Sequence, residues 1–394
     1  MNYPQIFLKK GKELSILRKH PWVFSGAIQR IDQNIADGDL IEVLAYDGSF
    51  LGIGHFQQAG SISVRIISFS NLQINQDFWN NIILNAINYR RRISLPSSTT
   101  NAYRLIHGEG DGLPGLIVDI YNDIAVIQCH SNGIHKSADQ IGKAISKLMS
   151  ETINTIYVRT KETLPDHYDQ ENENEFLIGN NEETIITENN IRFKINVVTG
   201  QKTGFFLDQR DNRALLGEYS TAKSVLNCFS YTGGFSMYAL ALGALEVDSV
   251  DISQKAVDLM NENAGLINFD GKHTSICGNV MQYLSDPSVK KYDVVIIDPP
   301  AFAKSIHKRH NAVQAYKRLN VLAMKKVTSG GLLFTFSCSQ VVGTQLFFDT
   351  IVAAGIEADK KVRLVKNLSQ GPDHPINLFH PEGHYLKGLL LYIE

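Results

Sequence analysis

The stretch Asn227-Cys228-Phe229-Ser230-Tyr231-Thr232-Gly233-Gly234-Phe235 decides the fold that this sequence predicts. It follows an apolar run, 224–228, that is typical of a buried strand, and it opens a helical run over 235–242. Glycines at such a turn let the backbone approach a ligand closely. A strand over 247–251 and a helix over 254–265 come next. This alternation predicts an α/β fold with a mostly parallel, doubly wound sheet.

Two further stretches each follow a predicted buried strand. Asp298-Pro299-Pro300-Ala301-Phe302 comes after the run 292–297, and Phe336-Ser337-Cys338-Ser339 ends the run 331–336. Both therefore belong at the carboxyl edge of the sheet, where α/β folds place their chemistry. A carboxylate, a tight Pro-Pro turn, an aromatic ring and a thiol at one edge favour covalent chemistry on a planar ring.

The glycine turn predicts a nucleoside site. Asp251 ends the next strand, eighteen residues after Gly233, where its carboxylate can accept hydrogen bonds from ribose hydroxyls. The GxGxxG spacing is absent, which favours a nucleoside without phosphates. Asn279, after a strand predicted at 273–277, is placed to contact an adenine edge. The alternative is a close-packed strand–helix turn that has a purely structural role and binds no ligand.

The rest of the chain predicts two smaller domains, because 394 residues exceed one typical domain. Residues 1–72 form a β-rich module whose Asp47-Gly48 pair predicts a hairpin. Residues 73–195 combine helices and strands, and 196–394 hold the doubly wound domain. Strands are predicted at 41–44, 51–54, 63–67, 116–120, 124–129 and 154–159, and helices at 77–93 and 135–150. The polar stretch 165–183 predicts an exposed loop.

Composition narrows the class of protein. The chain is 43% hydrophobic and 20% charged with a net charge of −2. These values indicate a globular protein rather than a uniformly basic protein that coats nucleic acid. The four cysteines lie far apart, which fits a reducing cytosol without disulfides. No apolar run reaches about 18 residues, so we expect a cytoplasmic protein that does not span a membrane. No convincing ligand spacing links the later histidines, so we expect no metal; these are His307, His310, His374, His380 and His384.

Two basic segments predict contact with RNA. Residues 1–30 carry six cations against one acid, Glu13, with Trp22 and Phe24 among them. The cations are Lys9, Lys10, Lys12, Arg18, Lys19 and Arg30. Segment 303–318 carries five cations and no acid: Lys304, Lys308, Arg309, Lys317 and Arg318. Basic residues interleaved with aromatics suit RNA, although a charge run is usually only a solvated face.

The sequence resembles class I S-adenosylmethionine-dependent methyltransferases and, more closely, the bacterial 23S ribosomal RNA large-subunit cytosine-5 methyltransferase I family. The matching stretches span nearly the whole chain: 17–26, 103–106, 108–115, 202–210, 226–235, 298–302, 336–339 and 381–383. The resemblance implies an N-terminal PUA domain, a central α+β domain and a Rossmann-like methyltransferase domain. The chain departs from the family at Ala301, where a lysine is expected.

The same resemblance implies the site residues and partners. S-adenosylmethionine would be held by Phe229, Ser230, Tyr231, Thr232, Gly233, Gly234, Phe235, Asp251, Asn279, Asp298 and Pro299. RNA contacts are expected from Phe302, Lys304, Arg309, Lys9, Lys10 and Trp22. The expected partner is 23S rRNA or a large-subunit precursor, with no membrane, and a homodimer is left open.

Cys338 is the candidate nucleophile, because a thiolate that adds to carbon 6 of a pyrimidine activates carbon 5. Asp298 would hydrogen-bond the base, and Phe302 would stack on it. Cys129, Cys228 and Cys277 are expected to be packing residues. Two alternatives stay open: methylation of an exocyclic nitrogen of adenine or guanine, with Cys338 idle, and an RNA-binding protein without catalysis.

Overall fold

The computed structural model describes residues 3–32, 34–164, 173–303 and 305–394, and they form two compact units. The first unit comprises Met1–Thr187, Ile195–Leu207 and Pro372–Gly383. The second comprises Glu188–Lys194, Asp208–Gly371 and His384–Glu394. The chain thus leaves the second unit near its end and returns to the first for one short segment.

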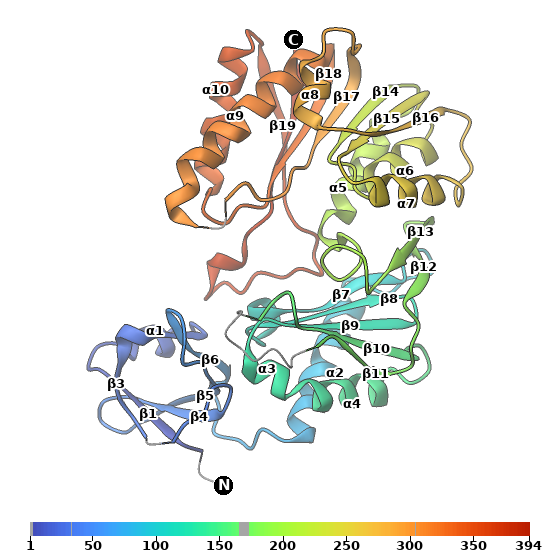
Figure 1. Cartoon of the computed structure of the whole chain (residues 1–394). Coiled ribbons are helices and arrows are strands. Elements are labelled where there is room, and N and C mark those ends of the chain that lie inside the picture. Colours follow the sequence, from blue (N-terminus) through green and yellow to red (C-terminus); the bar gives the residue numbers. More distant parts are fainter. Residues whose placement is uncertain (1–2, 33, 165–172, 304) are drawn as a thin grey trace. The chain divides into compact units, whose positions relative to one another are not determined.

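The first unit begins with a six-stranded sheet, ordered β2-β6-β5-β4-β1-β3 (Figure 1). Its strands are β1 Gln5–Leu8, β2 Trp22–Phe24, β3 Ile28–Ile31, β4 Leu40–Leu44, β5 Phe50–Phe56 and β6 Ile62–Ser68, with a short helix α1 at Leu14–Leu17. The antiparallel pair β4 and β5 confirms the hairpin expected at Asp47-Gly48. Val43, Ile53 and Ile66 are fully or almost fully buried, so the sheet has its own apolar core.

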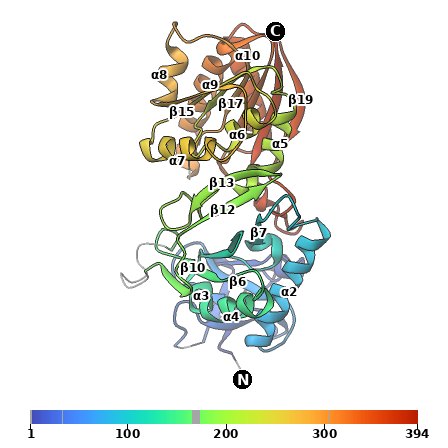
Figure 2. The same cartoon turned by 90° about the vertical axis from the view of Figure 1, so that its right-hand side faces the viewer.

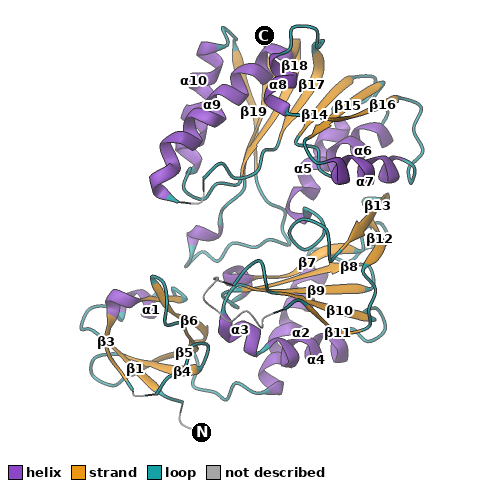
Figure 3. Ribbon diagram, in the orientation of Figure 1, coloured by secondary structure: helices purple, strands orange, loops and turns teal. Residues whose placement is uncertain are grey.

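A second sheet in this unit runs in the order β11-β10-β9-β8-β7 (Figure 3). Its strands are β7 Ala102–His107, β8 Leu116–Tyr121, β9 Ile124–Cys129, β10 Thr155–Arg159 and β11 Glu175–Ile178. Helices α2 Gln76–Arg92, α3 Asn132–Lys136 and α4 Ala138–Leu148 accompany it. Asn75 caps α2 by accepting the N–H of Phe78, and the helix buries Trp79.

The helix expected near 135–150 is confirmed as α4. The short helix α3 precedes it, because the Ser131 side chain accepts the N–H of Ile134 and the chain turns at Ser137. One expectation for this region was wrong. The loop expected over 165–183 contains the edge strand β11, which pairs with β10. β11 is a short edge strand whose apolar residues are only partly buried or exposed, and they follow a polar, acidic stretch, so no alternating pattern marks the strand. Residues 165–172 lie outside the described residues.

A two-stranded sheet of β12 Glu183–Glu188 and β13 Ile191–Asn196 follows. The second unit is then a seven-stranded sheet in the order β16-β15-β14-β17-β18-β20-β19 (Figure 1, Figure 2). Its strands are β14 Ser224–Cys228, β15 Glu246–Asp251, β16 Lys272–Cys277, β17 Tyr292–Ile297, β18 Val327–Ser337, β19 Val362–Leu368 and β20 Lys387–Ile393. The first five in this order are parallel, and β20 is antiparallel to both neighbours.

Helices cover both faces of the seven-stranded sheet, which confirms the doubly wound α/β fold (Figure 1, Figure 2). They are α5 Arg210–Glu218, α6 Gly234–Ala241, α7 Gln254–Ala264, α8 Val280–Ser285, α9 Arg309–Lys326 and α10 Thr344–Glu357. β14 has β15 on one side and β17 on the other. The strand order therefore reverses between β14 and β17, and ligands of such folds bind at this switch point.

Candidate active site

The loop after β14 has a strained backbone. Phe229 and Tyr231 adopt φ angles of 59° and 47°, and Gly233 adopts 83°. A residue other than glycine in this left-handed region costs about 1–3 kcal/mol and persists only where its surroundings enforce it. At Gly233 a Cβ atom would lie 2.7 Å from Cγ of Met260, so glycine is required there for space as well. Such strain is typical of a ligand-binding loop.

Asp251 fixes that loop. Its Oδ2 accepts the N–H of Tyr231 at 2.8 Å, and its Oδ1 accepts the N–H of Ser253 at 2.9 Å. Each carboxylate oxygen can accept a further hydrogen bond, so Asp251 keeps acceptor capacity for ribose hydroxyls. The expected ribose role is compatible with this geometry, and the anchoring of the loop is an added role that the sequence did not predict.

Several polar groups around the loop suit a polar nucleoside such as S-adenosylmethionine. The buried hydroxyls of Ser230 and Thr232 find no hydrogen-bond partner among the described residues. A buried hydroxyl without a partner costs about 1–3 kcal/mol, so these groups favour a site completed by a ligand or water. Asn279 is exposed, and its Oδ1 caps α8 by accepting the N–H of Gln282 at 3.2 Å. Its amide group stands at the carboxyl end of β16, as expected for an adenine contact.

Asp298 and Cys338 start from the same edge of the sheet. Ile297, at the end of β17, pairs with Cys228 on one side and with Thr335 of β18 on the other. The loops that follow β14, β17 and β18 therefore begin at neighbouring positions along the same edge of the sheet. This register confirms the expectation that the carboxylate and the thiol share the carboxyl edge.

A buried glutamine orients Asp298. Nε2 of Gln209 donates a hydrogen bond of 3.0 Å to Oδ2 of Asp298, and Nδ2 of Asn212 donates one of 2.6 Å to Oε1 of Gln209. Both amides come from the start of α5 and are almost fully buried. Sequence reasoning missed them, although Gln209 lies in one of the stretches that carried the family resemblance. Pro299 is buried directly after the carboxylate.

Cys338 is half-buried at the end of β18, with aromatic and basic neighbours. Ser339 shares a hydrogen bond of 3.0 Å with the Tyr316 hydroxyl, and its carbonyl oxygen accepts one of 2.9 Å from Nζ of Lys387. Burial lowers the pKa of Lys387 to about 8, and the Cys338 thiolate opposes that shift. The rings of Phe302 and Tyr316 lie 4.7 Å apart, so Phe302 packs against α9.

The other three cysteines differ from one another. Cys129 and Cys228 are fully buried, and burial raises the pKa of both thiols, for Cys129 to about 12. Their expected packing role is confirmed. Cys277 is exposed, with its Sγ 3.5 Å from the carbonyl oxygen of Ile252. Its expected packing role was wrong, because the strand β16 ends at the surface of the unit.

The amino-terminal basic segment is exposed at its lysines. Nζ of Lys9 donates to the carbonyl of Gly26 at 2.9 Å, and Lys10 lies over the ring of Tyr46. Trp22 is engaged within its own unit, because its indole N–H donates to Oε1 of Glu109 at 2.9 Å. The lysines keep free surface for phosphates, whereas Trp22 already serves packing in the structure.

The second basic segment is less uniform than expected. Arg309 is exposed at the first position of α9, and Lys308 precedes it. Lys317 forms an ion pair of 2.7 Å with Glu357 of α10, so an acidic residue outside the segment offsets part of its charge. Lys304 lies outside the described residues.

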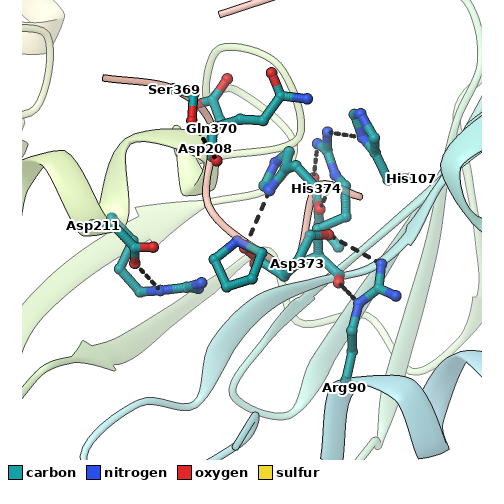
Figure 4. A network of polar contacts seen from close by, with 12 residues as sticks. Arg90, His107, Asp208, Asp211, Ser369, Gln370, Asp373 and His374 are labelled. Atoms are coloured by element: carbon teal, nitrogen blue, oxygen red, sulfur yellow. Dashed lines mark hydrogen bonds and ion pairs between the residues drawn. The ribbon is translucent and has the colours of Figure 1, made fainter. Parts of the chain in front are cut away.

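The returning segment Pro372–Gly383 is held by buried polar contacts. Asp373 accepts the N–H of Arg104 at 3.0 Å through Oδ2, and its carbonyl accepts a hydrogen bond of 3.0 Å from Arg90 (Figure 4). Nδ1 of His374 lies 3.2 Å from Oδ1 of Asp373, and the ring centroids of His374 and His107 lie 5.0 Å apart. From the sequence alone, His374 in Asp373-His374-Pro375 is expected to lie in a solvated loop; the structure shows it 2% exposed, so that expectation was wrong.

One histidine–carboxylate cluster was not foreseen. His20, the buried His380 and Glu382 bring one ligand atom each within 4.8 Å of one another. However, Nδ1 of His20 accepts the N–H of Trp22 at 3.2 Å. The neutral ring then carries its proton on Nε2, the atom that faces Glu382 at 4.0 Å. A protonated Nε2 offers no lone pair to a metal ion, so this arrangement does not favour a metal site.

None of the described helices has the length and apolar character needed to cross a membrane.

Two family models match the chain. Residues 103–389 match that of the S-adenosylmethionine-dependent methyltransferases, and residues 6–69 match that of PUA-like domains.

Curated relatives match over nearly their full length. "Ribosomal RNA large subunit methyltransferase I" of Aeromonas salmonicida is 38% identical over 395 residues, which cover 98% of each chain. The protein of the same name from Aliivibrio fischeri is 37% identical over 389 residues, covering 97% of this chain and 98% of the relative.

Solved structures share the fold. A candidate SAM-dependent methyltransferase from Streptococcus mutans superposes with a TM-score of 0.84 at 22% identity, covering 100% of both chains. A candidate methyltransferase solved in complex with SAH gives the same TM-score at 21% identity and the same coverage. At this identity the likeness supports the fold of the whole chain.

Proposed function

Because the chain belongs to the S-adenosylmethionine-dependent methyltransferases, and within them to the ribosomal RNA large subunit methyltransferase I family, we propose that it methylates carbon 5 of a cytosine in 23S rRNA through a covalent adduct with Cys338. Methylation of ribosomal RNA with S-adenosylmethionine follows from the family. The base atom and the covalent route are our proposal. One observation carries it: Cys338 and Asp298 directly follow neighbouring parallel strands at the edge that adjoins the Gly233 loop.

The chemistry explains why a thiol is needed. Carbon 5 of cytosine is a poor nucleophile, and addition of the Cys338 thiolate to carbon 6 makes it enamine-like. S-adenosylmethionine supplies an electrophilic methyl group when bound. Once carbon 5 carries the methyl group, its proton leaves to a base, and the electron pair of the C–S bond returns to sulfur. The enzyme is thereby regenerated as a thiolate.

Asp298 supports the addition step. A carboxyl group that hydrogen-bonds the amine or ring nitrogen of cytosine favours attack at carbon 6. Gln209 holds this carboxylate through Oδ2, which fixes the direction in which Oδ1 points. Phe302 is proposed to stack on the flipped base with the part of its ring that Tyr316 does not cover.

The cofactor-binding residues are proposed from the strained loop. The backbone of 229–235 would approach the ligand, Asp251 would accept ribose hydroxyls, and Asn279 would contact the adenine edge. Asp298 and Pro299 close this side of the site. The exposed lysines of the PUA-like region, together with Arg309, are proposed to bind rRNA phosphates.

Replacement of Cys338 by alanine tests the proposal. The variant should lose methyl transfer to 23S rRNA completely, yet bind S-adenosylmethionine in calorimetry as the wild type does. RNA with 5-fluorocytosine at the target should trap an adduct with the wild type, because fluorine cannot leave as a proton. Cys277→Ala, which removes an exposed thiol of the same unit, should still form the adduct.

Near-normal turnover by the Cys338→Ala enzyme would refute the covalent route. The reaction would then be methylation of an exocyclic nitrogen, centred on Asp298 and Phe302. Mass spectrometry of the methylated nucleoside distinguishes these two products directly.

A further inference from the structure

Lys387 occupies an unusual place beside the proposed nucleophile. It is the first residue of β20 and pairs with Ser337, the residue before Cys338, in the antiparallel ladder of β18 and β20. The side chain is 4% exposed. Lysine is rarely buried to this extent unless an opposite charge accompanies it.

The hydrogen bonds of Lys387 do not neutralise its charge. Its Nζ donates to the carbonyl oxygen of Ser339 at 2.9 Å, which is the one hydrogen bond found for it among the described residues. A carbonyl is a neutral acceptor, and an ammonium group has three N–H donors. An uncompensated ammonium buried in this way would be strongly unfavourable.

A Cys338 thiolate would supply a compensating charge, because Lys387 pairs with the residue before Cys338 and donates to the carbonyl of the residue after it. Burial depresses the pKa of Lys387, and the one charge that opposes this effect is the Cys338 thiolate. No carboxylate contributes. Among the described residues, two neighbouring titratable groups are Tyr316 of α9, whose pKa burial raises, and Asp298, directly after β17, which Gln209 engages. Tyr316 is therefore neutral near pH 7, and the ammonium and the thiolate are left as a pair.

We propose that Lys387 is a positioning residue that holds Cys338 as a thiolate through charge pairing at the end of β18. This inference rests on the proposed function of Cys338. Addition of the sulfur to carbon 6 removes the negative charge from sulfur, and elimination restores it. The same ammonium therefore favours the reactive form of the nucleophile before addition and stabilises the leaving thiolate afterwards.

Alkylation by iodoacetamide tests the proposal without RNA or cofactor. The thiolate attacks the carbon and iodide leaves, so the rate reports the thiolate fraction at each pH. Peptide mass spectrometry follows Cys338 and the exposed Cys277 in the same digest, which provides an internal reference. In the wild type, the alkylation midpoint of Cys338 should lie below that of Cys277.

Lys387→Met should raise the Cys338 midpoint by at least about one pH unit and slow alkylation at pH 7 about tenfold. Lys387→Arg should keep most of the low midpoint, because it keeps the charge. Lys326→Met is the matched control. Lys326 is also a buried lysine that donates to two backbone carbonyls, of Asp286 and Val289, and no thiol acts on it. Lys326→Met should lower thermal stability but leave the alkylation midpoint of Cys338 unchanged.

A Cys338 midpoint equal to or above that of Cys277 in the wild type would overturn the proposal, even if Lys387→Met failed to fold. An unchanged midpoint in folded Lys387→Met would overturn it as well, as would a Cys338 that resists alkylation throughout. Failure of the proposed function is separate, because it is read from methyl transfer by Cys338→Ala.

Discussion

The backbone N–H of Tyr231 donates a hydrogen bond of 2.8 Å to Oδ2 of Asp251, which ties the strained loop after β14 to the end of β15. The carboxylate that a nucleoside would use for its ribose thus also holds the loop that receives the nucleoside. Loss of this carboxylate should disturb both the ribose interaction and the shape of the site.

We expect Asp251→Asn to weaken S-adenosylmethionine binding by tenfold or more and to lower stability. Its amide N–H₂ group would face one of two backbone N–H donors, which leaves that donor unpaired at a cost of about 1–3 kcal/mol. Calorimetry and thermal melts measure both effects. The control is Asp258→Asn, an exposed carboxylate on α7 that accepts from Gln254. Equal cofactor affinity in the two variants would contradict the role of Asp251.

We expect Gln209→Ala to lower kcat about tenfold or more while cofactor affinity stays near that of the wild type. Without the hydrogen bond of 3.0 Å from Nε2, Asp298 is no longer held in one orientation. Steady-state methylation kinetics measure the loss. Gln345→Ala, an exposed glutamine on α10, should behave as the wild type. A normal kcat in Gln209→Ala would show that Asp298 needs no such support.

We expect the change of Lys9, Lys10 and Lys12 to glutamate to weaken RNA binding and to flatten its salt dependence. Each lysine–phosphate interaction that the change removes lowers the slope of log K against log salt by about 0.7 for single-stranded RNA. Filter binding across a salt series measures the slope. A matched change of Lys255, Lys290 and Lys291 on the second unit should leave the slope nearly intact. Identical slopes for all three proteins would contradict RNA binding by the amino-terminal lysines.

We expect the stability of the first unit to fall as the pH drops below about 6.5. Burial lowers the pKa of His55 to about 4, and Arg65 and Lys136 add to the effect. The ring is neutral in both states above its unfolded pKa of about 6.5, and protonation below that favours the unfolded chain. Each pH unit between about 6.5 and 4 should therefore remove up to about 1.4 kcal/mol.

Denaturant titrations from pH 7.5 to 4.5 check this expectation, with His55→Gln as the comparison. The glutamine variant is less stable at neutral pH but should lose less stability on acidification. A wild-type profile with the same pH slope as the variant would rule out His55 as the cause.

The sequence was enough to place Asp298 and Cys338 at one edge of the sheet, but it did not reveal every residue that acts there. Asp298 and Cys338 could be placed together because parallel strands of one sheet present their carboxyl ends at one edge. The expected packing role of Cys277 was wrong, because an apolar run predicts a strand but does not show whether the last residue of that strand is buried. The strand β11 was missed for a related reason, because an edge strand needs no apolar alternation.

The sequence by itself determined the alternation of strands and helices, the glycine turn and the family, since these depend on local spacing and on motifs read along the chain. Only the tertiary structure decided that Gln209 meets Asp298, 89 residues away, and that Lys387 meets Ser339 beside Cys338, 48 residues away. Those pairs depend on the order β14-β17-β18-β20 and on the antiparallel return of β20. Strand order is set by the packing of the whole core, so no local pattern in the chain encodes which distant side chain will stand beside the nucleophile.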